Sequence, residues 1–391
     1  MQRIDNEKVQ GKRVLVRVDF NVPLAEGTVC DDTRIRAALP TIDYLRDKGA
    51  RIIVMSHLGR PEGVGYEEKY SLAPVARVLS RILGTEIKLA PYDKHDEAKM
   101  LADALKEGEM LLLENLRFDA REKKNDSGFA SELAELADIY VNDAFGAAHR
   151  AHASVEAITH LLPSYAGFLL DSEMATLTAM LNDPKRPFLA ILGGAKVSDK
   201  IKVIDALLDR VDTLIIGGGM CFTFLKAQGF EIGTSLCQDE WIEESLQLIQ
   251  KAQDQGVQLL LPVDIVAAGS LAEDAQAHVL SVDEMDSALM GLDIGPASCE
   301  LFARAIAVAK TIFWNGPMGV FEVKPFETGT LTIAKAVAGQ QSATSIVGGG
   351  DSVAAIKAFG VEDAIDFIST GGGASMQLLE GASLPGVEAL Q

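Results

Sequence analysis

The sequence predicts an α/β protein of two lobes, each a doubly wound parallel sheet covered by helices. Three observations lead to this prediction. Short β-branched runs alternate with amphipathic helical stretches along the whole chain, which is the pattern of βα units in parallel sheets. The 391 residues are enough for two or three domains of ordinary size, ~150 residues each. Six β-type runs fall in the second half alone, enough for a complete doubly wound sheet.

The first half is predicted to contain four strands, with a helix between the first two. The strands are expected at residues 14–18, 51–56, 110–114 and 139–142. Between the first two, apolar residues recur every three to four positions, as one face of a helix requires, at Ile35, Leu39, Ile42 and Leu45. Gly49 follows at the position of a C-terminal cap, so this helix is expected to end there.

The second half is predicted to hold a complete Rossmann-like sheet of its own. Its strands are expected at residues 188–192, 213–216, 258–261, 311–314, 345–347 and 367–369. Residues 161–187 have little strand character, contain a helical segment around 173–181, and end in the linker-like run Asn-Asp-Pro-Lys-Arg-Pro. The predicted domains are therefore 1–165 and 186–370, with 166–185 as a connecting helix and linker.

Composition excludes several classes of function. No uncharged apolar stretch approaches the ~18 residues that cross a bilayer, and the first ten residues are polar, unlike a signal peptide. The four cysteines lie far apart without a CxxC pair, so reduced thiols in a cytoplasmic protein are expected. A formal charge of −20 repels nucleic acid and anionic membranes, and neither is an expected partner. Most of this negative charge lies in the second half.

Cationic and hydrogen-bonding residues follow the predicted strands of the first half. Ligands of open parallel sheets bind beyond the carboxyl ends of the strands. Arginine donates two hydrogen bonds to a carboxylate or phosphate from its planar fork, so this edge is predicted to bind a small polyanion. A solvated surface charge is the alternative for any single arginine, and Asp19 and Asn21 are also candidate helix caps. The residues after these strands are Asp19, Phe20 and Asn21; His57, Leu58, Gly59 and Arg60; Asn115, Leu116 and Arg117; and Asn142 and Asp143, with Arg34 and Arg150 in neighbouring loops.

Glycine runs follow the predicted strands of the second half, at residues 193–194, 217–219, 316–319, 348–350 and 371–373. Glycine lets backbone amides approach a ligand, and a following helix offers its positive N-terminal end to phosphate. Tight turns alone also need glycine, but five runs at successive strand ends favour a nucleotide-binding edge. Neither GxxxxGK(S/T), nor GxGxxG after a strand, nor the HRD and DFG marks of protein kinases occur.

Four charged residues near these glycines are further candidates. Lys196 and Lys200 are four residues apart and are expected on the first turns of one helix, where both face a phosphate chain or act as ordinary surface lysines. Glu322 is a candidate for ribose hydroxyls. Asp351 is a candidate for magnesium or for a helix N-cap. His149 and His152 have no third ligand nearby, which argues against zinc.

Nine motifs in order, spanning Val16 to Ser375, resemble the phosphoglycerate kinase family: VRVDFNVP, SHLGRP, LLLENLRF, NDAFGAAHRAHAS, GGAKVSDK, IIGGGM, FWNGPMGVFE, GGGDS and ISTGGGAS. The resemblance implies a glycolytic enzyme that reversibly transfers the acyl phosphate of 1,3-bisphosphoglycerate to Mg-ADP, giving 3-phosphoglycerate and ATP. It also implies a monomer whose lobes close about a hinge near Ser369 and Thr370. By the same resemblance, residues 371–391 pack back on the first lobe.

The resemblance also assigns residues to sites. Those of the acid substrate would be Asp19, Phe20, Asn21, Arg34, His57, Leu58, Gly59, Arg60, Arg117 and Arg150. Those of the nucleotide would be Gly194, Ala195, Lys200, Gly218, Gly219, Leu292, Asn315, Pro317, Glu322, Gly349, Gly350, Asp351 and Ser352, with Asp351 holding magnesium. The transferring phosphoryl group would be stabilised by Arg34, Lys196 and Lys200, and by the helix starts at Gly349 and Gly372.

The sequence departs from the family pattern at two positions and leaves two rival functions. Ser352 and Ala147 stand where the family usually has threonine. A Rossmann-type dehydrogenase of a phosphorylated acid would need a dinucleotide fingerprint, which the sequence lacks. A nucleotide or anion sensor on this scaffold would be expected to have lost Arg34 or one of the two lysines, and all three are present.

Overall fold

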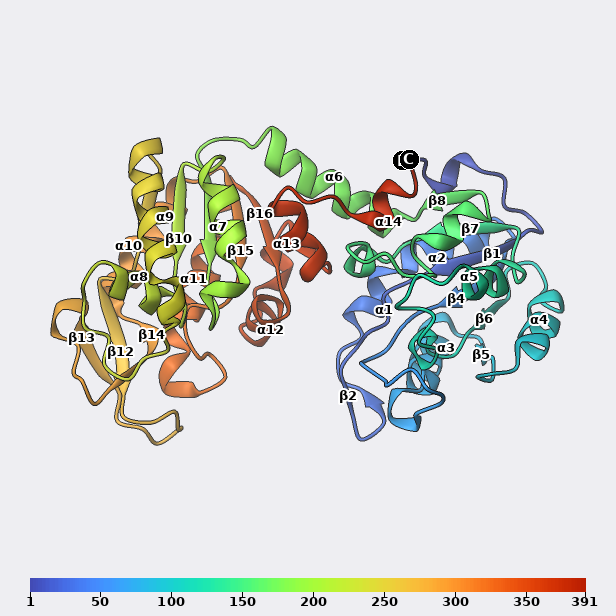
Figure 1. Cartoon of the computed structure of the whole chain (residues 1–391), viewed down its shortest axis with the longest axis horizontal. Helices are drawn as coiled ribbons and strands as arrows, with labels where there is room; N and C mark the ends of the chain where they lie inside the picture. Colours follow the sequence, from blue (N-terminus) through green and yellow to red (C-terminus); the bar gives the residue numbers. More distant parts are fainter. The chain divides into compact units, whose positions relative to one another are not determined.

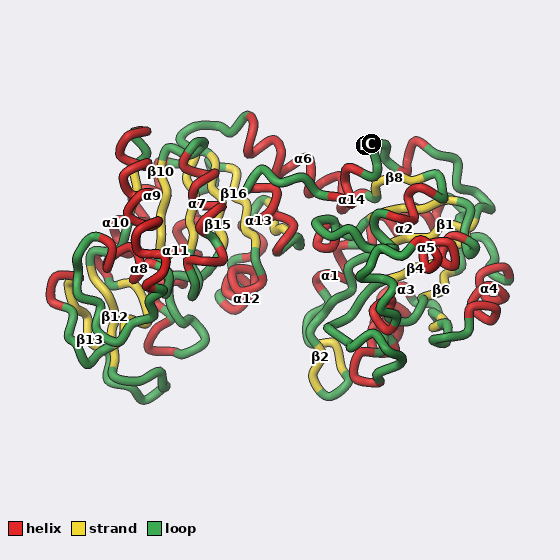
Figure 2. The backbone as a smooth tube through the Cα atoms, in the orientation of Figure 1, coloured by secondary structure: helices red, strands yellow, loops and turns green.

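The computed structural model describes all 391 residues and forms two compact units. Unit 1 consists of Met1–Thr176 with Ser383–Gln391, and unit 2 of Leu177–Ala382. Each unit holds one six-stranded sheet with helices around it (Figures 1 and 2). The predicted fold class, two lobes built on parallel sheets, is therefore confirmed. None of the helices is both long enough and apolar enough to cross a membrane.

The sheet of unit 1 has the strand order β5-β6-β4-β1-β7-β8, and every pair in it is parallel. Its strands are β1 (Arg13–Arg17), β4 (Arg51–Met55), β5 (Lys88–Leu89), β6 (Met110–Leu112), β7 (Ile139–Asn142) and β8 (Ser164–Ala166). The winding direction reverses between β1 and β7, and a sheet of this type binds ligands at such a switch point. Strands β5 (Lys-Leu) and β8 (Ser-Tyr-Ala) were not predicted, because neither is an uninterrupted apolar run.

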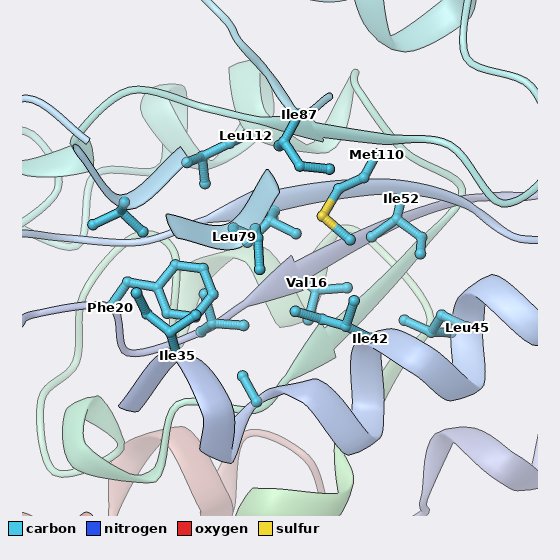
Figure 3. Close-up of a cluster of buried hydrophobic side chains, with 14 of the residues drawn as sticks. Val16, Phe20, Ile35, Ile42, Leu45, Ile52, Leu79, Ile87, Met110 and Leu112 are labelled. Atoms are coloured by element: carbon cyan, nitrogen blue, oxygen red, sulfur yellow. The ribbon is translucent and has the colours of Figure 1, made fainter. Parts of the chain in front are cut away.

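The helices of unit 1 pack their apolar faces on this sheet. They are α1 (Thr33–Ala37), α2 (Leu39–Asp47), α3 (Ala73–Leu83), α4 (His95–Asp103), α5 (Ser127–Ala134) and α14 (Pro385–Glu388), and a small hairpin adds β2 (Leu24–Ala25) and β3 (Thr28–Val29). The single helix predicted across 35–45 is two helices, because the chain breaks at Ala38 and Pro40 stands in the first turn of α2. Figure 3 shows Ile42 and Leu45 of α2 packed beside Val16 of the sheet.

The sheet of unit 2 has the order β11-β10-β9-β15-β16-β17, again parallel throughout. Its strands are β9 (Phe188–Leu192), β10 (Thr213–Ile216), β11 (Gln258–Leu260), β15 (Thr311–Asn315), β16 (Thr344–Gly348) and β17 (Phe367–Ser369), so all six predicted strands are present. The winding direction reverses between β9 and β15. Residues on one face of the sheet, Ile191 and Trp314 among them, pack against Phe302 and Ile333.

Helices surround this sheet, and a second, antiparallel sheet adjoins it in the chain. The helices are α7 (Ile201–Leu208), α8 (Cys221–Ala227), α9 (Ile242–Gln255), α10 (Pro296–Val308), α11 (Thr328–Gly339), α12 (Gly350–Ala358) and α13 (Gly373–Leu379). The small sheet, in the order β13-β12-β14, comprises β12 (Asp264–Ala268), β13 (His278–Ser281) and β14 (Met290–Ile294). The sequence did not predict it.

Helix α6 (Phe168–Asn182) contains the boundary between the two units, which falls after Thr176. The predicted tail 371–391 is divided between the units. Residues 371–382 belong to unit 2 because α13 contacts α7 and Ser375 bonds Ser369 through their hydroxyls at 2.8 Å. Only Ser383–Gln391 belong to unit 1, where the Gly386 amide donates to the Ala148 carbonyl at 2.9 Å.

Candidate functional site

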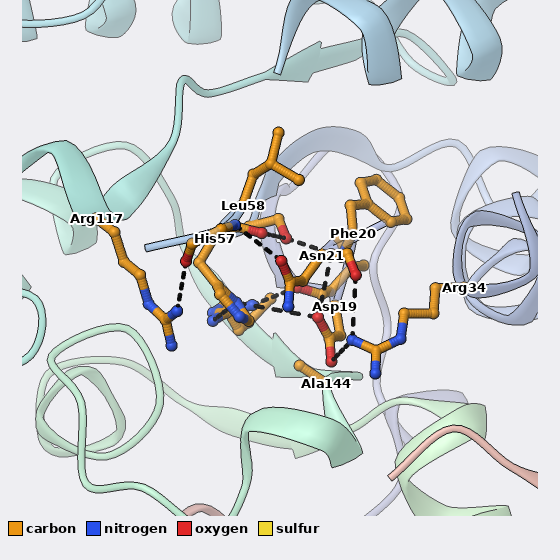
Figure 4. Close-up of polar contacts among 12 residues, drawn as sticks. Asp19, Phe20, Asn21, Arg34, His57, Leu58, Arg117 and Ala144 are labelled. Atoms are coloured by element: carbon orange, nitrogen blue, oxygen red, sulfur yellow. Dashed lines mark hydrogen bonds and ion pairs between the residues drawn. The ribbon is translucent and has the colours of Figure 1, made fainter. Parts of the chain in front are cut away.

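In unit 1 the loops that follow β1 and β4 are tied together by hydrogen bonds (Figure 4). The Asn21 side-chain oxygen accepts from the Gly59 amide at 2.8 Å, and the Phe20 amide donates to the Ser56 hydroxyl at 2.8 Å. We use the name anion edge for the ten residues predicted for the acid substrate: Asp19, Phe20, Asn21, Arg34, His57, Leu58, Gly59, Arg60, Arg117 and Arg150. Phe20 and Leu58 have buried side chains, so they offer the edge their backbone groups.

Asn115 joins the loop after β4 to the loop after β6. Its side-chain oxygen accepts from the amides of Leu58 and Arg117, both at 3.1 Å, and its amide group donates to the Leu58 carbonyl at 2.7 Å. The same side chain thus fixes the backbone positions of two residues of the anion edge. Its position directly after a predicted strand was the signal in the sequence, although the residue was not assigned to a site.

The arginines of the anion edge differ in their partners. Arg34 donates from Nη1 to Asp19 Oδ2 at 2.9 Å and to the Asn21 carbonyl at 3.4 Å. Arg117 is only 5% exposed, donates from Nη1 to the Gly59 carbonyl at 2.8 Å, and has no partner for Nε. Burial, together with the charges of Arg150 and Arg17, lowers the pKa of Arg117 to about 10. Arg117 is therefore a buried cation without a carboxylate partner.

His57 lies in the same positive surroundings. Its pKa is well below the usual value, first because of burial and then because of Arg17, Arg117, Arg150 and Arg34. Arg60 and Arg150 are exposed at the rim. Arg150 donates from Nε to His149 Nε2 at 2.9 Å, and no cluster of three His, Cys, Asp or Glu side chains suited to a metal ion occurs in the chain.

A buried chain of polar side chains lies behind His57, and no pattern in the sequence indicated it. It runs from His57 through Arg17 and Ser154 to Glu122. Arg17 is the last residue of β1. A charged residue in a strand usually faces solvent, yet the Arg17 side chain is fully buried.

In unit 2 a pocket of about 350 Å³ opens where the winding direction of the sheet reverses. Glycine loops after β9, β10 and β15 form one side of it, and the small antiparallel sheet contributes the other. The predicted residues that line it are Gly194, Ala195, Gly218, Gly219, Leu292, Pro317, Glu322 and Asp351. Apolar residues that the sequence did not single out complete the wall: Phe222, Leu236, Ile265, Leu271 and Met290. An apolar wall facing glycine backbone suits a nucleotide, with the base on one side and phosphates on the other.

The prediction that Lys196 and Lys200 share the first turns of one helix is wrong. A short 3₁₀ turn, Val197–Asp199, separates them, and α7 begins only at Ile201. Lys196 is exposed. Lys200 instead folds back and donates from Nζ to the carbonyls of Gly193 and Asn315, both at 2.7 Å, so it bridges the ends of β9 and β15. Burial lowers the pKa of Lys200 to about 7, against the raising effect of Asp351 and Asp199.

The remaining predicted residues hold the loops around Lys200. The Ser352 hydroxyl accepts a hydrogen bond from the Gly316 amide. Asn315 packs against Gly349, where an added Cβ would lie 2.9 Å from Asn315 Nδ2. Gly349 and Gly372 directly precede α12 and α13, with positive φ values of 91° and 49°. Gly350 is the first residue of α12, and Asp351 lies in its first turn without acting as the N-cap.

Replacing Gly316 with alanine is expected to destabilise unit 2 by about 2–4 kcal/mol, from left-handed strain plus overpacking. Its φ is 99°, and a Cβ there would lie 2.3 Å from the Gly193 carbonyl oxygen. Gly360→Ala is the matched control, because Gly360 has a φ of 65° and nothing within 4 Å of an added Cβ. Urea unfolding should show a much larger loss for Gly316→Ala, and equal losses would contradict the close approach.

Proteins of one family resemble this chain over nearly its whole length. Residues 4–382 match the model of the phosphoglycerate kinase family. A phosphoglycerate kinase of Moorella thermoacetica is 57% identical over 383 residues, 98% of this chain and 97% of that protein. One of Dictyoglomus turgidum is 51% identical over 386 residues, 99% of this chain and 97% of that protein. The chain belongs to the phosphoglycerate kinase family.

Solved structures agree with this assignment. The structure of phosphoglycerate kinase from Coxiella burnetii matches with a TM-score of 0.89 and 43% identity, covering 99% of this chain and 98% of that one. The crystal structure of phosphoglycerate kinase from Pyrococcus horikoshii matches with a TM-score of 0.88 and 31% identity, covering 100% of this chain and 98% of that one.

Proposed function

We propose that the protein transfers the acyl phosphate of 1,3-bisphosphoglycerate to Mg-ADP, reversibly, giving 3-phosphoglycerate and ATP. The anion edge of unit 1 binds the acid substrate, and the pocket of unit 2 binds the nucleotide. The attacking oxygen is already ionised, so the reaction needs placement and positive charge rather than a general base. Arg34, Lys196 and Lys200 supply that charge, together with the backbone amides at the starts of α12 and α13.

One observation carries the assignment of the acid substrate: Arg117 is buried and has no carboxylate partner. Burying a cation without a counterion is costly, and a phosphate or carboxylate of the substrate offsets that cost by accepting from its fork. Asp19 and Asn21 leave oxygen atoms beside Arg34, which suits a substrate that also carries a hydroxyl group.

Asp351 is the residue we propose to hold magnesium. Magnesium in nucleotide sites usually takes one or two carboxylates and completes its shell with phosphate oxygens and water. Asp351 lines the pocket from the first turn of α12, so its carboxylate fits a metal that arrives with the phosphates of the nucleotide. The ion would neutralise phosphate charge there.

We further propose that the two units close about α6 and the residues near Ser369 and Thr370 during turnover. Closure would bring the two substrates together and exclude water that would hydrolyse the acyl phosphate. The protein is proposed to act as a cytoplasmic monomer. Small-angle scattering with both substrates, with each alone and with none should show a smaller radius of gyration only when both are bound, and no change would contradict closure.

Turnover with 3-phosphoglycerate and Mg-ATP tests the proposal directly, coupled to glyceraldehyde-phosphate dehydrogenase and followed as loss of NADH. Rapid loss that needs both substrates and stops with EDTA would support the kinase reaction. Retained nucleotide binding without turnover would instead support a sensor built on the same fold.

Nucleotide binding above neutral pH is expected to take up a proton at Lys200. The pKa of Lys200 is lowered to about 7 in the free protein, and a phosphate beside it favours the charged ammonium and raises that pKa. Nucleotide affinity should therefore fall as the pH rises from 7 toward the pKa of the bound state. An ordinary lysine stays charged at pH ~8.5, so it would take up no proton there. Because Lys200 would take its proton from the buffer, the heat of nucleotide binding measured by calorimetry at this pH should vary with the ionisation enthalpy of the buffer. Lys200→Met should abolish that variation, and its persistence would contradict the assignment.

A further inference from the structure

The polar chain behind His57 has a defined direction at every step. Arginine carries five N–H donors and no acceptor, so its contacts fix which partner must accept. Arg17 Nη2 lies 3.1 Å from His57 Nδ1, and Arg17 Nε donates to the Ser154 hydroxyl at 2.9 Å. That hydroxyl then donates to Glu122 Oε1 at 2.6 Å. His57 Nδ1 therefore accepts a hydrogen bond and carries no proton.

The chain is held rigidly in a dry part of unit 1. Arg17, Ser154 and Glu122 are all fully buried. Glu122 accepts a second hydrogen bond from the Ser154 amide at 3.0 Å, and its Oε1 lies 3.6 Å from His152 Nδ1. Arg17 also donates from Nη1 to the Val18 carbonyl. A buried guanidinium and carboxylate bridged by one hydroxyl balance each other's charge, so Arg17 has a fixed position.

We infer that Arg17, held by Glu122 through Ser154, is a positioning residue that keeps His57 as the neutral Nε2–H tautomer, so that His57 offers a hydrogen-bond donor to the acid substrate. The imidazolium form would place an N–H on Nδ1 facing an N–H of Arg17, which is repulsive. The charges that face the ring agree with this: Arg17, Arg117, Arg150 and Arg34 are all cationic, and the nearest carboxylate oxygen, Asp19 Oδ1, is 4.0 Å from Nδ1.

The choice of tautomer matters for recognition. A neutral imidazole with the proton on Nδ1 would turn an acceptor toward an anion, and the contact would be repulsive. With the proton on Nε2, His57 adds a donor to an edge already rich in arginine without adding a further buried charge. The part of the inference that names the acid substrate rests on the proposed function. The tautomer itself does not.

The tautomer can be read from two-bond proton–nitrogen correlation spectra of the full-length protein labelled with ¹⁵N-histidine, at neutral pH and without substrate. His57 signals are identified by their absence in His57→Gln. The expected spectrum shows an unprotonated Nδ1 and a protonated Nε2. A protonated Nδ1, alone or together with Nε2, would overturn the inference. Because no substrate is present, this result is independent of the turnover test of the proposed function.

A charge-neutral double variant, Arg17→Met with Glu122→Gln, tests the positioning role without leaving a buried charge unpaired. The His57 signals should then become averages of two tautomers, and the KM for 3-phosphoglycerate should rise about tenfold while the KM for ATP stays within twofold. The matched control is Arg13→Met with Asp138→Asn. It removes another Arg–carboxylate pair, 2.9 Å apart, whose arginine lies on β1 as Arg17 does. An unchanged His57 spectrum in the Arg17 double variant, or the same spectral change in the control, would overturn the inference.

Discussion

Lys200→Ala is expected to lower kcat by about 10³-fold or more, the range for removing a cation that stabilises a transferring phosphoryl group. Lys200 Nζ donates two hydrogen bonds, to the carbonyls of Gly193 and Asn315, at the point where the winding of the unit 2 sheet reverses. Its third donor is free for a phosphate oxygen. Since two backbone contacts hold the ammonium in place before substrate arrives, little reorganisation is needed at the moment of transfer.

Steady-state kinetics with both substrates saturating measures this effect. Lys202→Ala is the matched control, because Lys202 lies in the first turn of α7, two residues after Lys200, and is exposed. The control should retain wild-type kcat. Circular dichroism and nucleotide titration should show that Lys200→Ala is folded and still binds ATP. A kcat within tenfold of the wild type would remove Lys200 from the catalytic residues.

Arg34→Ala is expected to abolish most turnover, by about 10²-fold or more, while the Kd for nucleotide stays within twofold. Arg34 belongs to unit 1, where Asp19 and the Asn21 carbonyl hold its guanidinium, whereas the nucleotide pocket is built wholly from unit 2. The loss should therefore fall on the acid substrate and on the transfer step. It should not fall on nucleotide binding.

Arg36→Ala provides the control for Arg34 on the same short helix. Arg36 is exposed and pairs with Asp32 rather than with a residue of the anion edge. Kinetics should show wild-type behaviour for Arg36→Ala, and calorimetry should show the same nucleotide affinity for both variants. If Arg34→Ala weakened nucleotide binding as much as it weakened turnover, the assignment of two separate sites would be contradicted.

The strands were predictable where a β-branched run was buried on both faces of a sheet. Strands β4 and β10 have this character, whereas β6 (Met-Leu-Leu) and β11 (Gln-Leu-Leu) were predicted from short apolar runs without a β-branched residue. The small antiparallel sheet was missed, although apolar residues of β14 alternate with Gly291 and Asp293, and β12 contains the β-branched pair Ile265 and Val266. That sheet nevertheless supplies one wall of the nucleotide pocket, including Leu292, which only the resemblance to a family had indicated.

The residues of the sites were predictable from their position after strands, but their contacts were not. Spacing placed Lys196 and Lys200 on one helix face, whereas the 3₁₀ turn between them directs Lys200 to two backbone carbonyls. Helical spacing assumes regular geometry, and a turn at a helix start removes it. Arg17 shows the same limit for strands. An arginine in an apolar run can lie in the core when a distant carboxylate, here Glu122, is brought beside it by the fold.

The return of the last nine residues to unit 1 has a consequence for synthesis on the ribosome. Unit 1 contains the first residues to emerge, yet Ser383–Gln391 also belong to it, and Leu384, Val387 and Leu390 of this segment are buried. The Gly386 carbonyl accepts from Asn142 next to the anion edge. Unit 1 is therefore completed only after Leu177–Ala382, the whole of unit 2, has been translated. A nascent chain should acquire a folded nucleotide pocket before the anion edge reaches its final form.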